Sequence, residues 1–184
     1  MTNSSRNDLR LVKKQLAYRL LYPQVPAVLC SRNGKTIAAM PAVSCISLSN
    51  SPALIGAAVK IGSNTERTVS KSSNFSLCWL GYSSKSQKII ADLSSKGKQG
   101  SDKLMEFGIR YESTRGVPVL DASKAYVVCR KVSSERFGDH MFFVGMILEV
   151  KASKDFTDQE YWKFETYKPI LYLGSNRKQA FMTI

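Results

Sequence analysis

The chain has little histidine, no closely spaced cysteines and no long apolar run among its 184 residues. His140 is the single histidine, so a metal centre of several histidines is excluded and one imidazole remains for acid–base chemistry. No CxxC redox, zinc or iron–sulfur motif is present, and we expect buried free thiols at Cys30, Cys45, Cys78 and Cys129. The longest apolar runs, 53–59 and 141–148, are too short to span a bilayer, and no signal-peptide core follows Met1. These absences predict a protein of the reducing cytoplasm with no membrane partner.

Positive charge is in large excess. Lysine and arginine number 27 against 14 acidic residues, which gives a net charge of +13. This charge favours phosphates, nucleotides, nucleic acid or an acidic protein as partners, without choosing among them. The hydrophobic fraction of 43% and charged fraction of 22% are typical of a globular chain. We expect an N-terminal arm and helix over residues 1–22 and one domain over residues 23–184.

The N-terminal arm has the pattern of an amphipathic helix. Asn7 or Asp8 can cap it, and apolar residues then recur at helical spacing, namely Leu9, Val12, Leu16 and Leu20. The helix should end before Pro23. A basic amphipathic helix can lie on a membrane, but we favour packing onto the protein body or onto a second subunit.

The rest of the chain predicts mainly β structure with α insertions. Short β-branched runs predict strands near 26–32, 35–40, 43–49, 53–60, 74–80, 124–132, 140–151, 170–173 and 179–183. Asn33-Gly34 marks a hairpin turn, and Gly145 marks a bulge or the close approach of another group. Short helices are expected from Ser63 towards Ser72 and over 86–94, 102–107 and 158–165, the last with the capping box of Thr157 and Glu160. Many short strands with inserted helices favour a barrel.

The segment 59–68 is a candidate phosphate site. Ser63 and Glu66 have the spacing of a capping box, so a helix should begin here after Gly62. A helix start presents free backbone N–H groups, and donors and positive charge come from Lys60, Ser63, Asn64, Thr65, Arg67 and Thr68. The alternative is an ordinary helix start that binds only water or its own cap.

Three further features permit chemistry but also have structural explanations. Pro41, within the small residues 38–44, should leave the sheet ladder and free the backbone to face a flat ligand, unless it only kinks an edge strand. His140 follows Gly138-Asp139, a turn that would place the imidazole at a strand mouth, either in a site or as a structural hydrogen-bonding group. We expect core positions rather than ring stacking for Tyr161, Trp162, Phe164, Tyr167 and Tyr172.

The chain also resembles a known family. In order it contains PAVLCS, NGKTIAAMPAVSCISLSNSPALIGAAV, NTERTVSKSSNFSLCWL, DKLMEFGI, GVPVLDASKAYVVCRKV, GDHMFFVGMILEV and PILYLG. In this order and spacing the pieces resemble the flavin reductase-like, FMN-binding split-barrel family over about residues 23–175. The resemblance implies FMN at the rim of a split β-barrel, in a homodimer whose interface contributes to the site.

The resemblance also implies site residues. The isoalloxazine would lie against the backbone of Ala39, Met40, Pro41, Ala42, Val43 and Ser44. The phosphate would lie near Val59, Lys60, Asn64 and Thr65, with further contacts from Ser83, Ser84 and Lys85. His140 matches the GDH-type turn and would lie where a nicotinamide docks. The chain departs from the family pattern at Cys78, where an asparagine is common, and in lacking a tryptophan after Val43.

The function implied is an NAD(P)H-dependent flavin reductase that binds FMN, with FAD as the alternative, and passes hydride from nicotinamide to flavin. A flavoredoxin-like electron carrier or a ferric reductase is the alternative within the family, and the net charge would suit an acidic electron-transfer partner. A nucleic-acid-binding β-barrel without chemistry is the distant alternative. It would explain the charge, but the expected strands lack the basic and aromatic alternation that stacks bases.

Overall fold

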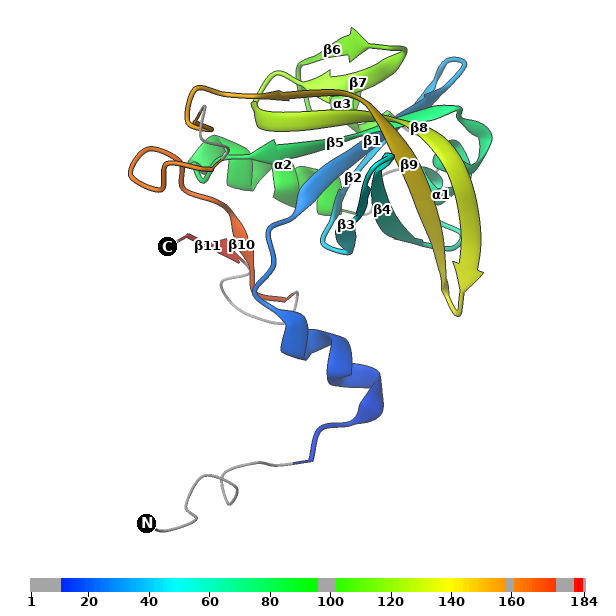
Figure 1. The fold of residues 1–184 in the computed structure, drawn as a ribbon, viewed down its shortest axis with the longest axis horizontal. Helices are drawn as coiled ribbons and strands as arrows, with labels where there is room; N and C mark the ends of the chain where they lie inside the picture. Colours follow the sequence, from blue (N-terminus) through cyan, green and yellow to red (C-terminus); the bar gives the residue numbers. More distant parts are fainter. Residues whose placement is uncertain (1–10, 96–101, 158–160, 175–180, 184) are drawn as a thin grey trace.

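The fold is centred on one seven-stranded antiparallel sheet (Figure 1). The computed structural model describes residues 11–95, 102–157, 161–174 and 181–183. The sheet contains β1 (Ala27–Asn33), β2 (Thr36–Ala42), β3 (Cys45–Asn50), β4 (Ala53–Lys60), β5 (Asn74–Leu80), β8 (Ser123–Phe137) and β9 (His140–Ala152). Its strand order is β2-β1-β5-β8-β9-β4-β3. All seven strands lie close to predicted ones.

The order of the strands makes the sheet a split barrel. β2 and β3 are its two edges, yet only Val43 and Ser44 separate them in sequence. The sheet must therefore curve until its edges approach each other at this connection. Ser44 also accepts a hydrogen bond from the backbone N–H of Ala58 on β4, at 2.9 Å. The two edge strands are not paired with each other, so the barrel stays open along this line.

Strand alternation divides the apolar residues into two cores. On β1, Ala27 and Leu29 face the barrel interior, where Phe75 and Phe143 are also fully buried. The opposite residues of β1 belong to an outer core. That core is covered by α2 (Ser84–Ser94), α3 (Lys103–Glu106) and the hairpin of β6 (Tyr111–Thr114) and β7 (Val117–Leu120). Helix α1 (Asn64–Lys71) packs on β1 and β2 and contributes Val69 to the interior core.

Gly145 on β9 confirms the expected close approach. A Cβ at this position would lie 2.5 Å from Cζ of Phe75 and 2.6 Å from Cβ of Cys129. The pairing of β8 with β9 also shifts register beside it, between Lys131 and Ser133. A glycine is required because any side chain would enter the interior core.

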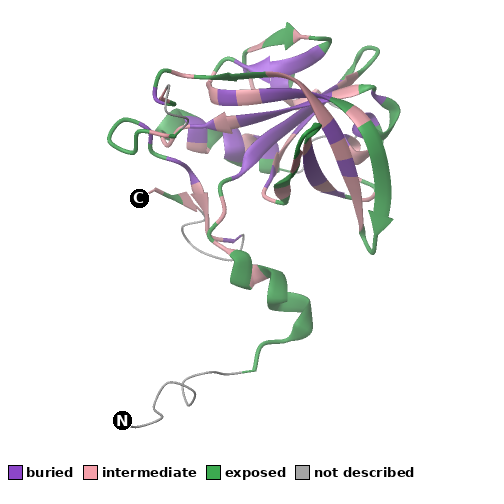
Figure 2. Cartoon of the chain, viewed as in Figure 1, coloured by how far each residue is buried: buried purple, intermediate pink, exposed green. Residues whose placement is uncertain are grey.

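The N-terminal arm extends from the body (Figure 1). It contains η1 (Lys14–Leu21), a 3-10 helix, and not a regular α-helix as its spacing suggested. No residue of η1 is buried, so it does not pack onto the body, and Figure 2 shows most of it exposed. The helix ends before Pro23 as predicted, whereas the caps at Asn7 and Asp8 and the apolar Leu9 lie outside the described residues. Within the described chain, no helix is long and apolar enough to cross a membrane.

One hairpin was missed and one predicted helix was wrong. The β6–β7 hairpin was not predicted, although Arg115 and Gly116 adopt positive φ angles of 49° and 83° at its turn. The predicted helix over 158–165 does not form at 161–165, where Trp162 bridges to Phe156 instead. Residues 158–160, including the proposed cap partner Glu160, lie outside the described residues. At the C-terminal end β10 (Leu171–Tyr172) pairs with β11 (Phe181–Met182), while 179 and 180 lie outside the described part.

Candidate functional site

Three of the predicted site segments meet where the two edges of the open barrel approach each other. We call this region the closing corner and define it as residues 42–44, 58–65 and 139–140. The hydrogen bond from Ala58 to Ser44, described above, joins β4 to the residue that directly precedes β3. On the other side, Lys60 of β4 pairs with His140 of β9, and the N–H of Ile61 donates to the carbonyl of Asp139 at 2.9 Å. Residues far apart in sequence therefore form one edge of the barrel.

The start of α1 has the predicted capping box. The Ser63 hydroxyl accepts from the Glu66 N–H at 3.0 Å, and the Glu66 carboxylate accepts from the Gly62 N–H at 3.1 Å. The hydrogen bonds of the described residues leave the N–H groups of Asn64 and Thr65 without an acceptor. These two donors lie at the positive end of the helix dipole, where an anion is stabilised.

The side chains around this helix start have different roles. Lys60 is exposed at the end of β4 and supplies positive charge. The Arg67 guanidinium donates to the Gly62 carbonyl at 2.5 Å, so it also lies at the helix start. Thr68 is buried and its hydroxyl donates to the Asn64 carbonyl at 2.9 Å. Its predicted contribution as a phosphate donor was therefore wrong, and the hydroxyl of Ser63 is committed to its cap.

The β2 end of the corner belongs to a strand with only one strand neighbour. Pro41 does not leave the ladder as predicted, because it is paired opposite Val28 within β2. β2 is nevertheless an edge strand, so its other side has no strand neighbour. The side chain of Ala39 belongs to the outer core, whereas Met40 and Ala42 face the interior. After them, Val43 is half-buried and Ser44 is exposed.

His140 lies at the mouth of β9, on the exposed turn that Gly138 makes with a φ of +59°. Its Nδ1 lies 2.8 Å from Oδ1 of Asp139. The hydrogen bond from His140 lowers the pKa of Asp139, so this carboxylate stays charged and holds the ring. In the neutral imidazole, Nδ1–H donates to Asp139 and Nε2 keeps a free lone pair. The side chain is 42% exposed, so a ligand can reach it.

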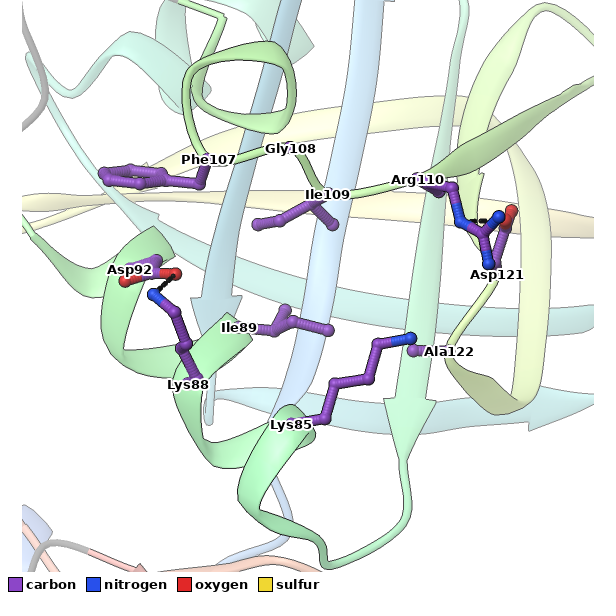
Figure 3. A pocket seen from close by; sticks show the side chains of 10 residues that line it. All are labelled: Lys85, Lys88, Ile89, Asp92, Phe107, Gly108, Ile109, Arg110, Asp121 and Ala122. Atoms are coloured by element: carbon purple, nitrogen blue, oxygen red, sulfur yellow. Dashed lines mark hydrogen bonds and ion pairs between the residues drawn. The ribbon is translucent and has the colours of Figure 1, made fainter.

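Ser83, Ser84 and Lys85 lie on another element, the start of α2. The Ser83 hydroxyl caps this helix by accepting from the Ser86 N–H at 3.1 Å. Lys85 lines a cavity of about 160 Å³ between α2, the segment 107–110 and the turn at 121–122 (Figure 3). Two other cations of this cavity are paired, Lys88 with Asp92 at 2.9 Å and Arg110 with Asp121 at 3.6 Å. The structure thus places Lys85 in a cavity outside the closing corner.

The structure has a second cavity, which the sequence analysis did not predict. It is an open, largely apolar groove of about 580 Å³, and we call it the aromatic groove. Its walls come from strands and from the C-terminal segment, and include Trp79, Val150, Phe156, Trp162, Phe164 and Tyr167. Trp162 stacks on Tyr167 with centroids 4.0 Å apart. Tyr167 is buried as expected, but Tyr161 and Phe164 are 52% and 51% exposed, so the core prediction was wrong for these two.

The four cysteines are free thiols, as predicted; Cys30, Cys78 and Cys129 are also buried as expected, whereas Cys45 is only partly buried. Desolvation raises the pKa of the Cys45 thiol, beside the closing corner, to about 12, which favours the protonated thiol. Cys78, where the family commonly has asparagine, is fully buried in the outer core.

The comparison with known families decides the classification. The flavin reductase like domain matches residues 18–180. The chain belongs to this family. Family membership agrees with the split barrel and with the chain order of the motifs, and the matched region covers nearly the whole chain.

Two archaeal proteins have similar sequences. An uncharacterised protein of Pyrococcus abyssi is 30% identical over 134 residues, covering 71% of this chain and 75% of its own length. An uncharacterised protein of Aeropyrum pernix is 25% identical over 171 residues, covering 92% of this chain. This chain spans 65% of the Aeropyrum protein's length.

Several solved structures share the fold at lower identity. An FMN-binding protein from Thermus thermophilus, solved with cyclohexenone, has a TM-score of 0.81 at 22% identity, covering 96% of this chain and 94% of its own. A flavoredoxin from Methanosarcina acetivorans has a TM-score of 0.77 at 17% identity, covering 96% and 91%. The flavin reductase PheA2 has a TM-score of 0.71 at 15% identity, covering 94% and 99%.

Proposed function

We propose that this flavin reductase-like protein binds FMN at the closing corner and reduces it with NAD(P)H. The observation that carries the proposal is the convergence of two free helix N–H donors, a free strand edge and His140 on one edge of the barrel. The names of the structural relatives, which include an FMN-binding protein and a flavin reductase, support a flavin as the ligand.

The corner fits the two chemically different ends of FMN. The phosphate would accept hydrogen bonds from the N–H groups of Asn64 and Thr65, with Lys60 supplying charge. The isoalloxazine would lie along residues 39–44, where backbone groups of the β2 edge can bond its polar rim. Val59, which precedes Lys60 on β4, is fully buried in the interior core and would contribute through its backbone. FAD is the alternative ligand. Ser83, Ser84 and Lys85 lie outside the closing corner, at the start of α2, and are proposed to contact the part of the flavin nucleotide that extends beyond the corner.

The flavin, when bound, supplies the hydride-accepting ring, and the protein supplies binding and orientation. Asp139 holds the His140 imidazole by the 2.8 Å hydrogen bond. We assign His140 the role of positioning the nicotinamide or holding a proton beside the ring, because alignment is the main requirement of hydride transfer. No other histidine exists in the chain to take this role.

The partners proposed are nicotinamide nucleotides and a second copy of the chain in a homodimer. A flavoredoxin-like electron carrier or a ferric reductase is the second candidate function. The net charge of +13 favours it, because an acidic redox protein would be attracted electrostatically.

The test begins with purified protein incubated separately with FMN, FAD and riboflavin, and with fluorescence titration of each ligand. The expected result is saturable FMN binding, followed by bleaching of the flavin on anaerobic mixing with NADH or NADPH. Bound FMN that neither nicotinamide bleaches would assign the electron-carrier function instead. Protein that takes up no flavin but binds single-stranded DNA would refute flavin binding and favour the nucleic-acid barrel.

A further inference from the structure

Two apolar surfaces of the molecule have no partner in the described chain. The first is the arm of residues 11–21, which ends in η1. Leu20 and Leu21 are 72% and 66% exposed, and Leu11 is fully exposed. Because an isolated helix of eight residues is unstable in water, an ordered arm needs a surface to pack against.

The second surface is the aromatic groove. Val150 is 64% exposed on its β9 wall, and Phe156 and Phe164 are also exposed. Contiguous exposed apolar surface of this kind marks an interaction site on a folded protein. Contact between the groove and an arm would therefore bury exposed apolar surface on both.

The arm begins at the rim of the groove but points away from it. Gln24 and Tyr172 exchange two backbone hydrogen bonds of 3.3 and 2.8 Å, which pin the root of the arm beside β10. Val25 and Leu171, next to this anchor, line the groove. Pro23 and Pro26 flank the anchor and fix φ at these two positions, which limits the directions that the arm can take. Figure 1 shows the arm leaving the body.

We propose that the arm of each copy lies in the aromatic groove of a second copy. A two-fold axis near the two roots would bring each arm to the other groove, giving an isologous interface. The inference rests on the homodimer proposed above and is independent of flavin chemistry.

The area involved suits a stable dimer. The arm offers five exposed aliphatic side chains, Leu11, Val12, Leu16, Leu20 and Leu21. Each buries roughly 60–120 Å² of apolar surface when covered. Two arms and two grooves of matching area would then bury roughly 1,200–2,400 Å², against about 1,200–2,000 Å² in stable interfaces.

Disulfide trapping between two chains tests the exchange. One chain carries Leu20→Cys and a size tag, and the co-expressed second chain carries Val150→Cys. The expected product under mild oxidation is a covalent heterodimer, at least about tenfold more abundant than with Met105→Cys in place of Val150→Cys. Met105 is a suitable control because it is 83% exposed but lies on α3, away from the groove.

Two other outcomes overturn the proposal. A crosslinked monomer from the double variant Leu20→Cys, Val150→Cys would show that the arm folds into its own groove. Equal trapping at positions 150 and 105, or no trapping at either, would show that the arm does not dock there.

A second measurement removes the dependence on engineered cysteines. Val150→Glu should raise the dimer dissociation constant by at least about tenfold in sedimentation equilibrium. Met105→Glu is the control and should leave this constant unchanged. An unchanged constant for Val150→Glu would refute the inference. FMN titration of the same samples separates the two proposals: trapping without flavin binding leaves the exchange standing and removes the flavin function.

Discussion

The closing corner and the aromatic groove lie towards opposite ends of β9 and are built in opposite ways. The corner takes His140 from the start of the strand and contains free N–H donors, charge and an exposed imidazole. The groove takes Val150 and Ala152 from the end of the strand and is lined mainly by apolar side chains. The polar corner suits a ligand recognised by hydrogen bonds and charge, whereas the apolar groove suits a surface recognised by burial.

The comparison explains why only one of the two was found from sequence. A polar site contains local patterns, because caps, turns and glycines are needed to expose donors. An apolar groove is lined by residues that look like core in the sequence, and only the tertiary structure shows that Val150 and Phe164 are exposed. Removing polar contacts should therefore weaken ligand binding at the corner strongly and leave the groove almost unaffected.

The largest expected effect is on phosphate binding at the corner. Lys60→Ala with Asn64→Pro should weaken FMN binding on the order of a hundredfold, because the pair of substitutions removes a positive charge and one of the two free N–H donors at a helix position that tolerates proline. A hydrogen bond to a charged group contributes about 1.5–3 kcal/mol. Riboflavin, which lacks the phosphate, should lose less than about threefold. Fluorescence titration of both ligands measures the ratio.

The groove variant Val150→Ala is the matched control and should leave both affinities unchanged. Equal losses for FMN and riboflavin in the corner variant would move the phosphate elsewhere, with Ser83 and Lys85 at the start of α2 as the next positions to test.

The next effect is on reduction rather than binding. His140→Ala should keep bound FMN and an almost unchanged melting temperature, but slow flavin reduction by NAD(P)H on the order of tenfold to a hundredfold through lost alignment. Stopped-flow absorbance on fully loaded protein measures it. A wild-type rate would make His140 a structural residue, and Trp162→Leu in the groove should not change this rate.

The elements that could be predicted from sequence are those with local signals. Asn33-Gly34 predicted the β1–β2 hairpin, and Gly34 has the expected positive φ of 58°. Ser63 and Glu66 predicted the capped start of α1, which the hydrogen bonds confirm. Gly145 predicted a close approach, although nothing in the sequence named Phe75 as the neighbour.

The errors arose where distant contacts decide the structure. The spacing of Thr157 and Glu160 favours a helix, but the pairing of Phe156 with Trp162 holds the described part of this segment in an irregular conformation. Pro41 has no N–H, yet it stays in β2 because an edge strand needs no partner on its far side. The candidate site residues came from motifs and from the family resemblance, whereas their meeting at the corner follows from the curvature of the sheet.

A substitution in the middle of β9 tests whether the two regions share one rigid strand. Gly145→Ala places a Cβ within 2.6 Å of Cys129 and closer still to Phe75, so these neighbours must shift. The free energy of unfolding should fall by about 1–3 kcal/mol, as for other overpacked cores. Urea denaturation measures the loss, and an unchanged midpoint would show that the interior can yield there. FMN affinity and dimer stability should both decline if β9 aligns the corner and the groove together.

The smallest expected effect concerns the pair that holds the imidazole. The hydrogen bond from His140 lowers the pKa of Asp139 below its ordinary value, since it favours the charged carboxylate. His140→Ala should therefore raise this pKa towards the ordinary range, as measured by carboxyl-carbon NMR titration. Because the folded pKa is depressed, the stabilisation is fully present above the unfolded value and is lost as the pH falls through the folded value. Asp139 is 78% exposed, so the effect on stability should be slight while the titration shift stays measurable.

The titration of Asp155, which Lys124 holds at a pKa of about 2, is the internal control and should not move, because that pair lies beside the groove end of β9. A shift in Asp155 but not in Asp139 would mean that the substitution acts through the strand rather than through the imidazole.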